Sequence, residues 1–207
     1  MIKKFKTIIW DFDGVIIDSD NIRTESFRET FKDFGIDSVD KLINYHKLNG
    51  GLSRYHKVNF FFNKILKKNI TDDDYKSWVE LYGKYCKEKL CDKSLLIEDS
   101  INFIRKNYKN FSFHIASASD EKELKFICEK LEISDYFISI NGSPTTKVNN
   151  VKNILNSYHC IKENCCLIGD SINDREAAKI NNIKFFGYNN LDLKVDNSYI
   201  DKLNLEK

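Results

Sequence analysis

The sequence predicts an α/β fold, in which a parallel sheet covered by helices is interrupted after its first strand by a block of helices. Three observations lead to this expectation. A β-branched and aromatic run near the N-terminus, Lys6–Trp10, is typical of a buried strand. Residues 18–91 space their apolar side chains as helices do and show no strand pattern. Beyond residue 97 strand patterns alternate with helical ones, the order that produces a parallel sheet.

The helical block divides into four predicted helices. In the first, Ser19–Phe34, apolar residues recur at close to helical spacing, and Gly35 stands where a helix would end. The others are expected at Val39–Leu48, Ser53–Leu66 and Tyr75–Leu90, the last with a start signal at Thr71. We expect the aromatic residues of the block to pack its own core and not to bind a cofactor: Phe60, Phe61, Phe62, Trp78, Tyr82 and Tyr85.

The rest of the chain supplies four further strands and the helices between them. Strands are expected at 111–116, 136–140, 165–168 and 184–187, and helices at 97–107, 120–131, 147–156 and 173–181. Residues 1–17 and 92–207 are therefore predicted to form an α/β core domain, and residues 18–91 an inserted helical domain. His114 lies inside the second strand and is expected to be a core histidine.

Composition excludes several classes of protein. With 207 residues, 42% of them hydrophobic, the chain can bury a core without disulfides. Its 33 basic and 31 acidic residues leave a net charge of +2, so no basic excess is present to bind nucleic acid. There is no run of about 18 apolar residues to span a membrane, and we expect a cytoplasmic protein, monomeric or weakly homo-oligomeric. The cysteines form no C-x-x-C pair and are expected to be reduced thiols: Cys86, Cys91, Cys128, Cys160, Cys165 and Cys166.

Polar residues follow four of the predicted strands at the points where the strands end. They are Asp11 and Asp13 after the first strand, Ser117 and Ser119, with Ala118 between them, after the second, Lys147 after the third, and Asp170, Asn173 and Asp174 after the fourth. Because ligands bind beyond the carboxyl ends of parallel strands, we expect these residues to converge at one edge of the sheet.

The chemistry of this set points to phosphoryl transfer. Clustered carboxylates repel one another unless a cation joins them, and Mg²⁺ prefers oxygen ligands and bridges to phosphate. Lys147 and Ser117 can hold the remaining phosphate oxygens. A metal, an ammonium and a carboxylate nucleophile around one phosphorus are the requirements of transfer through an aspartyl-phosphate.

These residues resemble the four motifs of the haloacid dehalogenase (HAD) superfamily, in the family's order. Asp11–Ser19 (DFDGVIIDS) resembles the first motif, Ile115–Ser119 (IASAS) the second, Lys147 the third and Gly169–Asp174 (GDSIND) the fourth. The resemblance implies a Rossmann-like core with an α-helical cap of the C1 type, inserted where the helical block lies. It is greatest to the small phosphatases and the β-phosphoglucomutase group.

The resemblance also implies a role for each residue. Asp11 would attack phosphorus, while Asp13 would protonate the leaving oxygen and later activate water. Ser117 and the Ala118 amide would hold the transferring phosphoryl group, and Lys147 would neutralise its charge.

Mg²⁺ would be the cofactor. Its ligands would be Asp11, the backbone carbonyl of Asp13, Asp170 and, supporting it, Asp174. One departure from the family is Val148, where many members carry proline after the lysine.

Structural explanations compete with some of these roles. Ser117 could cap the helix that begins near Asp120, and Asp174 could cap the helix after Asp170. Lys147 could be a surface lysine.

Two of the five arginines are candidate substrate-binding residues in the cap. Arg54 follows Gly51-Leu52-Ser53 in a segment that resembles the specificity loop of the mutases, and it could bind a distal anionic group or be a surface arginine at a helix start. Lys57 and His56 are weaker candidates. Arg23 occupies the position of a mutase histidine that controls closure, and its presence favours hydrolysis.

The function expected is that of a Mg²⁺-dependent phosphatase acting on a small phosphomonoester, a sugar or polyol phosphate, with a cap that closes over the site. The alternative is a β-phosphoglucomutase-like mutase, which returns the phosphoryl group to sugar. A dehalogenase and a binding module without enzymatic activity are further alternatives.

Overall fold

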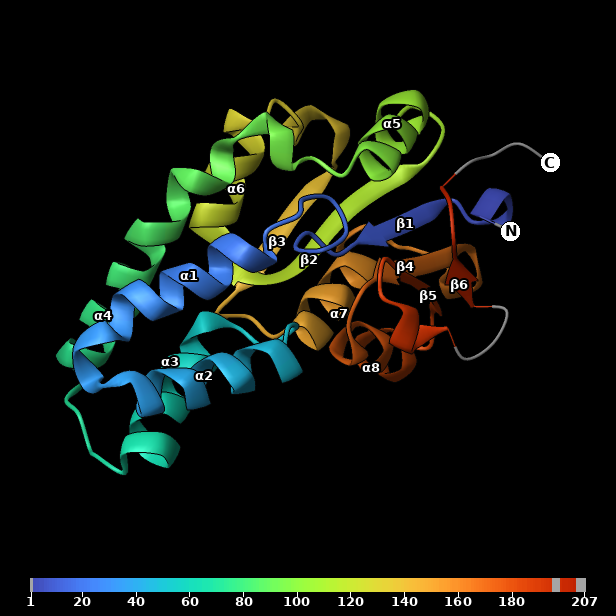
Figure 1. Cartoon of the computed structure of the whole chain (residues 1–207). Helices are drawn as coiled ribbons and strands as arrows, with labels where there is room; N and C mark the ends of the chain where they lie inside the picture. The colour runs from blue at the N-terminus through green and yellow to red at the C-terminus, as the bar shows by residue number, and fades with distance from the viewer. Residues whose placement is uncertain (1, 195–197, 204–207) are drawn as a thin grey trace.

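The strands form one six-stranded parallel sheet in the order β3-β2-β1-β4-β5-β6 (Figure 1). The computed structural model describes residues 2–194 and 198–203. The strands are β1 (Thr7–Trp10), β2 (Ser112–Asp120), β3 (Ser139–Ser143), β4 (Cys165–Gly169), β5 (Lys184–Tyr188) and β6 (Tyr199–Ile200). Trp10 pairs in register with Ile115 of β2 and Ile168 of β4, so the strand ends that carry the predicted site lie side by side. The α/β fold class predicted from the sequence is confirmed.

Helices cover both faces of the sheet. They are α5 (Glu98–Asn107), α6 (Glu121–Lys130), α7 (Lys147–Ser157) and α8 (Ile172–Ile180). Side chains of β1 alternate between two cores: Ile8 and Trp10 pack with residues of α5 and α6, whereas Ile9 packs with residues of α7 and α8. This burial on both faces explains why three consecutive residues of the strand, Ile8 to Trp10, are apolar.

Residues 20–87 form helices, and no strand lies among them. The elements are α1 (Asp20–Phe31), α2 (Ile36–Leu48), α3 (Arg54–Phe60), a π-helical segment η3 (Phe61–Leu66) and α4 (Asp72–Lys87). In Figure 1 this block, coloured blue to green, lies beside the sheet. None of the helices in the described part of the chain is long and apolar enough to cross a bilayer.

Aromatic side chains form the core of the helical block, as predicted. The Phe31 ring lies 4.4 Å from the Phe61 ring and 5.5 Å from that of Trp78, and Phe27 stacks on Tyr82 at 4.0 Å. His114 is also confirmed as a core residue, since it is buried. The six cysteines are free thiols.

The prediction for the third strand is wrong by three residues. Tyr136 belongs to a 3₁₀ turn, and β3 begins at Ser139 and runs to Ser143. As the edge strand, β3 is half-buried over its first three residues and carries few apolar side chains, so its own residues gave no strand pattern. The prediction was drawn toward the N-terminus by the aromatic Phe137, which lies before the strand. Two other differences are that β2 extends to Asp120 and that a sixth strand, β6, contains only two residues, too few for a periodic pattern.

Candidate active site

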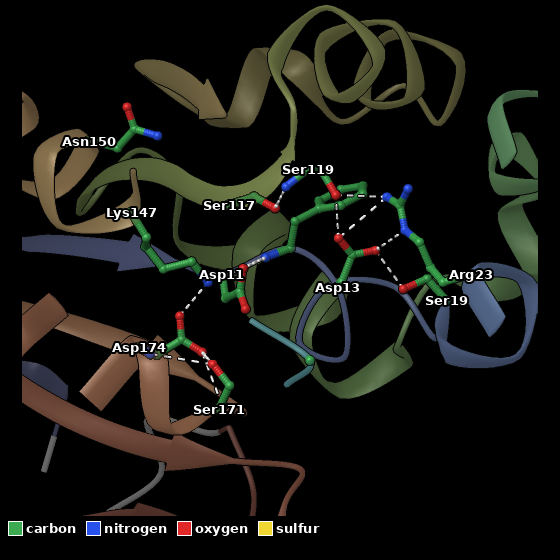
Figure 2. A network of polar contacts seen from close by, with 12 residues as sticks. Asp11, Asp13, Ser19, Arg23, Ser117, Ser119, Lys147, Asn150, Ser171 and Asp174 are labelled. Carbon is green, nitrogen blue, oxygen red and sulfur yellow. Dashed lines mark hydrogen bonds and ion pairs between the residues drawn. The ribbon is translucent and has the colours of Figure 1, made fainter. Parts of the chain in front are cut away.

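The predicted polar residues meet at the carboxyl ends of β1, β2 and β4, beside a cavity of about 600 Å³. The core lines this cavity with Asp11, Asp13, Ser117, Ala118, Lys147 and Asp170, and the helical block lines it with Arg23, His46, Arg54, Lys57 and Tyr82. Such a volume suits a small-molecule substrate. Figure 2 shows the network of polar contacts around Asp11 and Asp13.

Asp11, directly after β1, is the buried carboxylate at the centre of the site. Its Oδ1 accepts a hydrogen bond from the Phe12 amide at 2.7 Å and lies 2.8 Å from Lys147 Nζ. Burial raises its pKa well above the ordinary value, and the nearby charge of Asp174 adds to this effect against the attraction of Lys147.

Lys147 is the first residue of α7, which Thr146 caps by accepting the Asn149 amide. The lysine is buried and forms ion pairs with Asp11 and Asp174, so the alternative of a surface lysine is wrong. Burial alone would lower its pKa, but these two carboxylates raise it above the ordinary value. The side chain therefore stays charged beside the Asp11 carboxylate.

Three carboxylates form a cluster that can hold a cation. One oxygen from each of Asp11, Asp170 and Asp174 lies within 4.8 Å of the others. Burial, and next the charge of Asp174, raise the pKa of Asp170 to about 7. A group of carboxylate oxygens with too little positive charge nearby to balance them suits a hard divalent cation such as Mg²⁺. Gly14, at a φ of 75°, lets the chain pass here, because a Cβ at that position would overlap the Asp170 carboxylate.

Asp174 has the capping role that was considered from the sequence as well as its place in this cluster. Its carboxylate accepts hydrogen bonds from the amide and hydroxyl of Ser171, which caps α8 in return. The same residue also contacts Lys147. One buried side chain thus connects the start of α8 to the lysine.

Asp13 is held by two groups from the start of α1 and one from β2 (Figure 2). The Ser19 and Ser119 hydroxyls each donate to it at 2.5 Å, and Arg23 Nε donates at 3.0 Å. Burial alone would raise its pKa, but the charge of Arg23 and the two hydroxyl hydrogen bonds lower it. These contacts therefore favour the ionised form of the Asp13 carboxyl.

The ion pairs continue from Asp13 into the helical block. Arg23 Nη1 lies 2.9 Å from Glu123 of α6, and Arg54 Nη2 lies 2.8 Å from the other oxygen of Glu123 and 3.7 Å from Asp120. The structure thus places both predicted arginines at the cavity. Arg54 is buried, so it is not a surface arginine, although it is the first residue of α3.

Ser117 and Ala118 lie on the cavity wall at the end of β2. Asp120, and not Ser117, caps α6 by accepting the Glu123 amide, so the capping alternative for Ser117 is wrong. The Ser117 oxygen accepts the Ser119 amide at 3.0 Å, which leaves its hydroxyl hydrogen available to a ligand.

Sequence reasoning missed three residues of this region, namely Ser19, His46 and Glu123. Ser19 was visible only as the end of the first motif, and Glu123 only as a carboxylate one helical turn after Asp120. His46 carried no signal, because its contact with Lys57 joins two helices. His56, by contrast, is exposed and bonded to Tyr45, and it does not line the cavity.

The chain is similar to a known protein family in sequence and to several solved structures in fold. The model of a family described as haloacid dehalogenase-like hydrolase matches residues 8–188. A β-phosphoglucomutase from Clostridium difficile superposes with a TM-score of 0.80 at 20% identity, covering 96% of this chain and 91% of that one. A predicted phosphoglycolate phosphatase from Haemophilus somnus gives 0.73 at 18% identity, covering 89% and 85%.

A hydrolase of the same superfamily from Bacillus subtilis, whose structure is described as bound to magnesium, gives a TM-score of 0.68 at 18% identity and covers 96% of this chain and 95% of that one. At these identities the solved structures establish a shared fold.

Proposed function

The chain belongs to the haloacid dehalogenase-like hydrolase family, and on that premise we propose that it is a phosphatase that hydrolyses a small phosphomonoester through a phosphorylated Asp11. The observation that carries the proposal is the arrangement around Asp11. This buried carboxylate contacts Lys147, lies among the three clustered carboxylates and lines a cavity large enough for a small substrate. Division of the chain into a core and a helical cap, residues 18–91, is part of the proposal.

In the first step, an Asp11 oxygen forms a bond to phosphorus as the bond to the substrate's bridging oxygen breaks. Lys147 offsets the charge of the equatorial oxygens, and the Ser117 hydroxyl and the Ala118 amide donate to them. The leaving oxygen takes a proton from Asp13. Asp13 must be protonated for this step, so it must leave the contact with Arg23 that favours its ionised form.

In the second step, water attacks the phosphorus of the aspartyl-phosphate. Its proton goes to Asp13, inorganic phosphate leaves and the Asp11 carboxylate is regenerated. The contacts of Asp13 with Arg23, Ser19 and Ser119 suit this step, because they hold the carboxylate in the basic form.

Mg²⁺ fits the cluster of Asp11, Asp170 and Asp174, since the proximity of the three carboxylates and the raised pKa values of Asp11 and Asp170 indicate a shortage of positive charge. Asp11, Asp170 and the Asp13 carbonyl would hold the ion, with Asp174 in support. When bound, the ion would supply charge neutralisation for the phosphoryl oxygens.

The test is phosphate release from a panel of small phosphomonoesters. Wild-type protein is expected to release inorganic phosphate, and Asp11→Asn is expected to reduce kcat by about 10³-fold or more, because the amide cannot form the intermediate. Conversion of one sugar phosphate into another without free phosphate would instead establish the mutase.

Asp13→Asn provides a second test that separates the two steps. A p-nitrophenolate leaving group needs no proton, so this variant is expected to give a burst of about one equivalent of p-nitrophenolate and then stop, since water is no longer activated. Asp11→Asn should give no burst. Steady turnover by Asp13→Asn would contradict the assigned role of Asp13.

A further inference from the structure

The cavity is bordered by buried cations, and one of them lacks a counter-ion. Among the described residues the buried cations are Arg23, Arg54, Lys57 and Lys147. Arg23 is paired with Asp13, Arg54 with Glu123, and Lys147 with Asp11. Lys57 is only 3% exposed, yet it forms no ion pair with a carboxylate in the described part of the chain.

Within residues 2–194 and 198–203, the polar groups that contact the Lys57 ammonium are neutral. It donates to Nδ1 of His46 at 2.8 Å and to the carbonyl of Gly50 at 3.3 Å, which leaves one of its three hydrogens without a partner. Because Nδ1 accepts in this contact, His46 carries its hydrogen on Nε2, a buried atom that also has no partner. Two donors beside the cavity are therefore unused.

A buried charge without a counter-ion is unfavourable. The consequence is visible in both groups: burial lowers the pKa of Lys57 to about 7, and burial together with the charge of Lys57 lowers that of His46 to about 3. The charges of Asp13 and Asp20 act on Lys57 only through space. An anion that reaches Lys57 would supply the missing negative charge.

We infer that Lys57, with His46 beside it, binds a carboxylate of the substrate, so that the enzyme acts on a small phosphorylated carboxylic acid. This inference rests on the phosphatase function proposed above. Asp11 and Lys57 line the same cavity, so one molecule can place its phosphoryl group at Asp11 and its carboxylate at Lys57.

The local charges favour a carboxylate over a second phosphate. Arg23 and Arg54 carry two positive charges but face three carboxylates, those of Asp13, Glu123 and Asp120. The positive charges of the two arginines are therefore already balanced and cannot offset a second phosphate group, which is a dianion. His46 is neutral and adds no charge. Lys57 therefore offers a single positive charge, which matches a monoanion. For the same reason Arg54 is less suited than Lys57 to hold a distal anion.

The experiment compares substrates that differ only in the carboxylate. Each acid is paired with the alcohol of the same length: 2-phosphoglycolate with 2-hydroxyethyl phosphate, and 3-phosphoglycerate with glycerol 3-phosphate. For at least one pair, wild-type kcat/KM is expected to be about 10- to 100-fold higher for the acid, mostly through a lower KM. Lys57→Met should remove this preference and leave hydrolysis of the alcohol unchanged, which also shows that the variant folds. Lys47→Met is the matched control, because Lys47 is an exposed lysine at the same cavity and should keep the preference.

Three outcomes would overturn the inference. They are equal kcat/KM for acid and alcohol at every length, an equal loss on both members of a pair in Lys57→Met, and a stronger preference for bisphosphates than for acids. The phosphatase proposal fails separately, if no phosphomonoester, charged or neutral, releases phosphate.

Discussion

At the scale of single residues, His46 couples the fold to pH. Its imidazole is buried, packs 5.0 Å from the Phe27 ring and contacts the Lys57 ammonium. Burial, and then the charge of Lys57, lower its pKa to about 3. In the folded protein His46 therefore stays neutral over the range in which an unfolded histidine takes up a proton.

The sign of the effect on stability follows from this difference. A depressed histidine pKa contributes stability that is complete above the unfolded value near 6.5 and is lost as the pH falls toward about 3. In this window the slope is about 1.4 kcal/mol per pH unit. Between about pH 7.5 and about pH 5.5, wild-type protein should lose roughly 1 kcal/mol more free energy of unfolding than His46→Gln does.

Urea unfolding at the two pH values measures this difference. His159→Asn is the matched control, because His159 is exposed, and it should lose as much stability as the wild type. An equal loss in His46→Gln and wild type would show that His46 does not titrate as proposed.

At the scale of elements, the approach of the helical block to the core depends on a glycine. Gly51 follows α2, and a Cβ there would come within 2.6 Å of Ser171 Oγ and 2.8 Å of the Asn173 Cβ. These two residues lie at the start of α8, beside the carboxylate cluster. The loop after α2 can therefore approach the core as closely as it does only without a side chain.

Gly51→Ala is accordingly expected to hinder closure. We expect a fall in kcat/KM of about 10-fold, since overpacking of this kind costs about 1–3 kcal/mol. The free energy of unfolding should change little, because the contact lies in a half-exposed loop. Gly50→Ala is the matched control: nothing lies within 4 Å of a Cβ at Gly50, so its kinetics should match the wild type. Equal kinetics of the two variants would contradict this role for Gly51.

The same scale shows which features of the fold could be predicted. Strands β1 and β4 are buried on both faces, so their apolar runs located them to within a residue. Strand β3 is a half-buried edge, and β6 has two residues, so neither carries a pattern of its own. The positions of Asp11, Asp170 and Lys147 followed from the order of strand ends and the motifs.

The contacts made across elements were beyond prediction. Arg23 and Glu123 are 100 positions apart, and their ion pair depends on how α1 packs near α6. The contact of Lys57 with His46 joins α2 to α3 in the same way. Local spacing predicts which face of an element a side chain occupies, and tertiary packing decides which partner it meets.

At the scale of the whole molecule, the ion pairs of Arg23 and Arg54 link the helical block to the core. Arg23 of α1 and Arg54 of α3 share Glu123 of α6, and Arg23 also holds Asp13. Closure of the block and the ionisation of Asp13 are therefore expected to depend on each other. This coupling fits a catalytic cycle in which the helical block closes over the bound substrate before Asp13 activates water.

On the proposed function, a cation held by the carboxylate cluster is also expected to stabilise the whole fold. Asp11, Asp170 and Asp174 crowd together at the ends of β1 and β4, and burial together with Asp174 raises the pKa of Asp170 to about 7. Without a cation this repulsion destabilises the folded protein. Excess Mg²⁺ at about 100 times its Kd should stabilise the fold by about 2.7 kcal/mol, a rise in Tm of roughly 5–10 °C for a chain of this size.

Asp170→Asn tests this coupling, because it removes one charge from the cluster and keeps the shape of the side chain. In EDTA its Tm is expected to be higher than that of the wild type, since the repulsion is relieved. In Mg²⁺ the order should reverse, because the amide is a weaker ligand and the variant gains little from the ion. Asp192→Asn is the matched control, because this exposed carboxylate lines the cavity outside the cluster and should respond to Mg²⁺ as the wild type does. If Asp170→Asn is less stable than the wild type in EDTA, then Asp170 is a structural carboxylate and its repulsion does not destabilise the fold. If the variant gains as much stability from Mg²⁺ as the wild type does, then Asp170 is not a ligand of the cation.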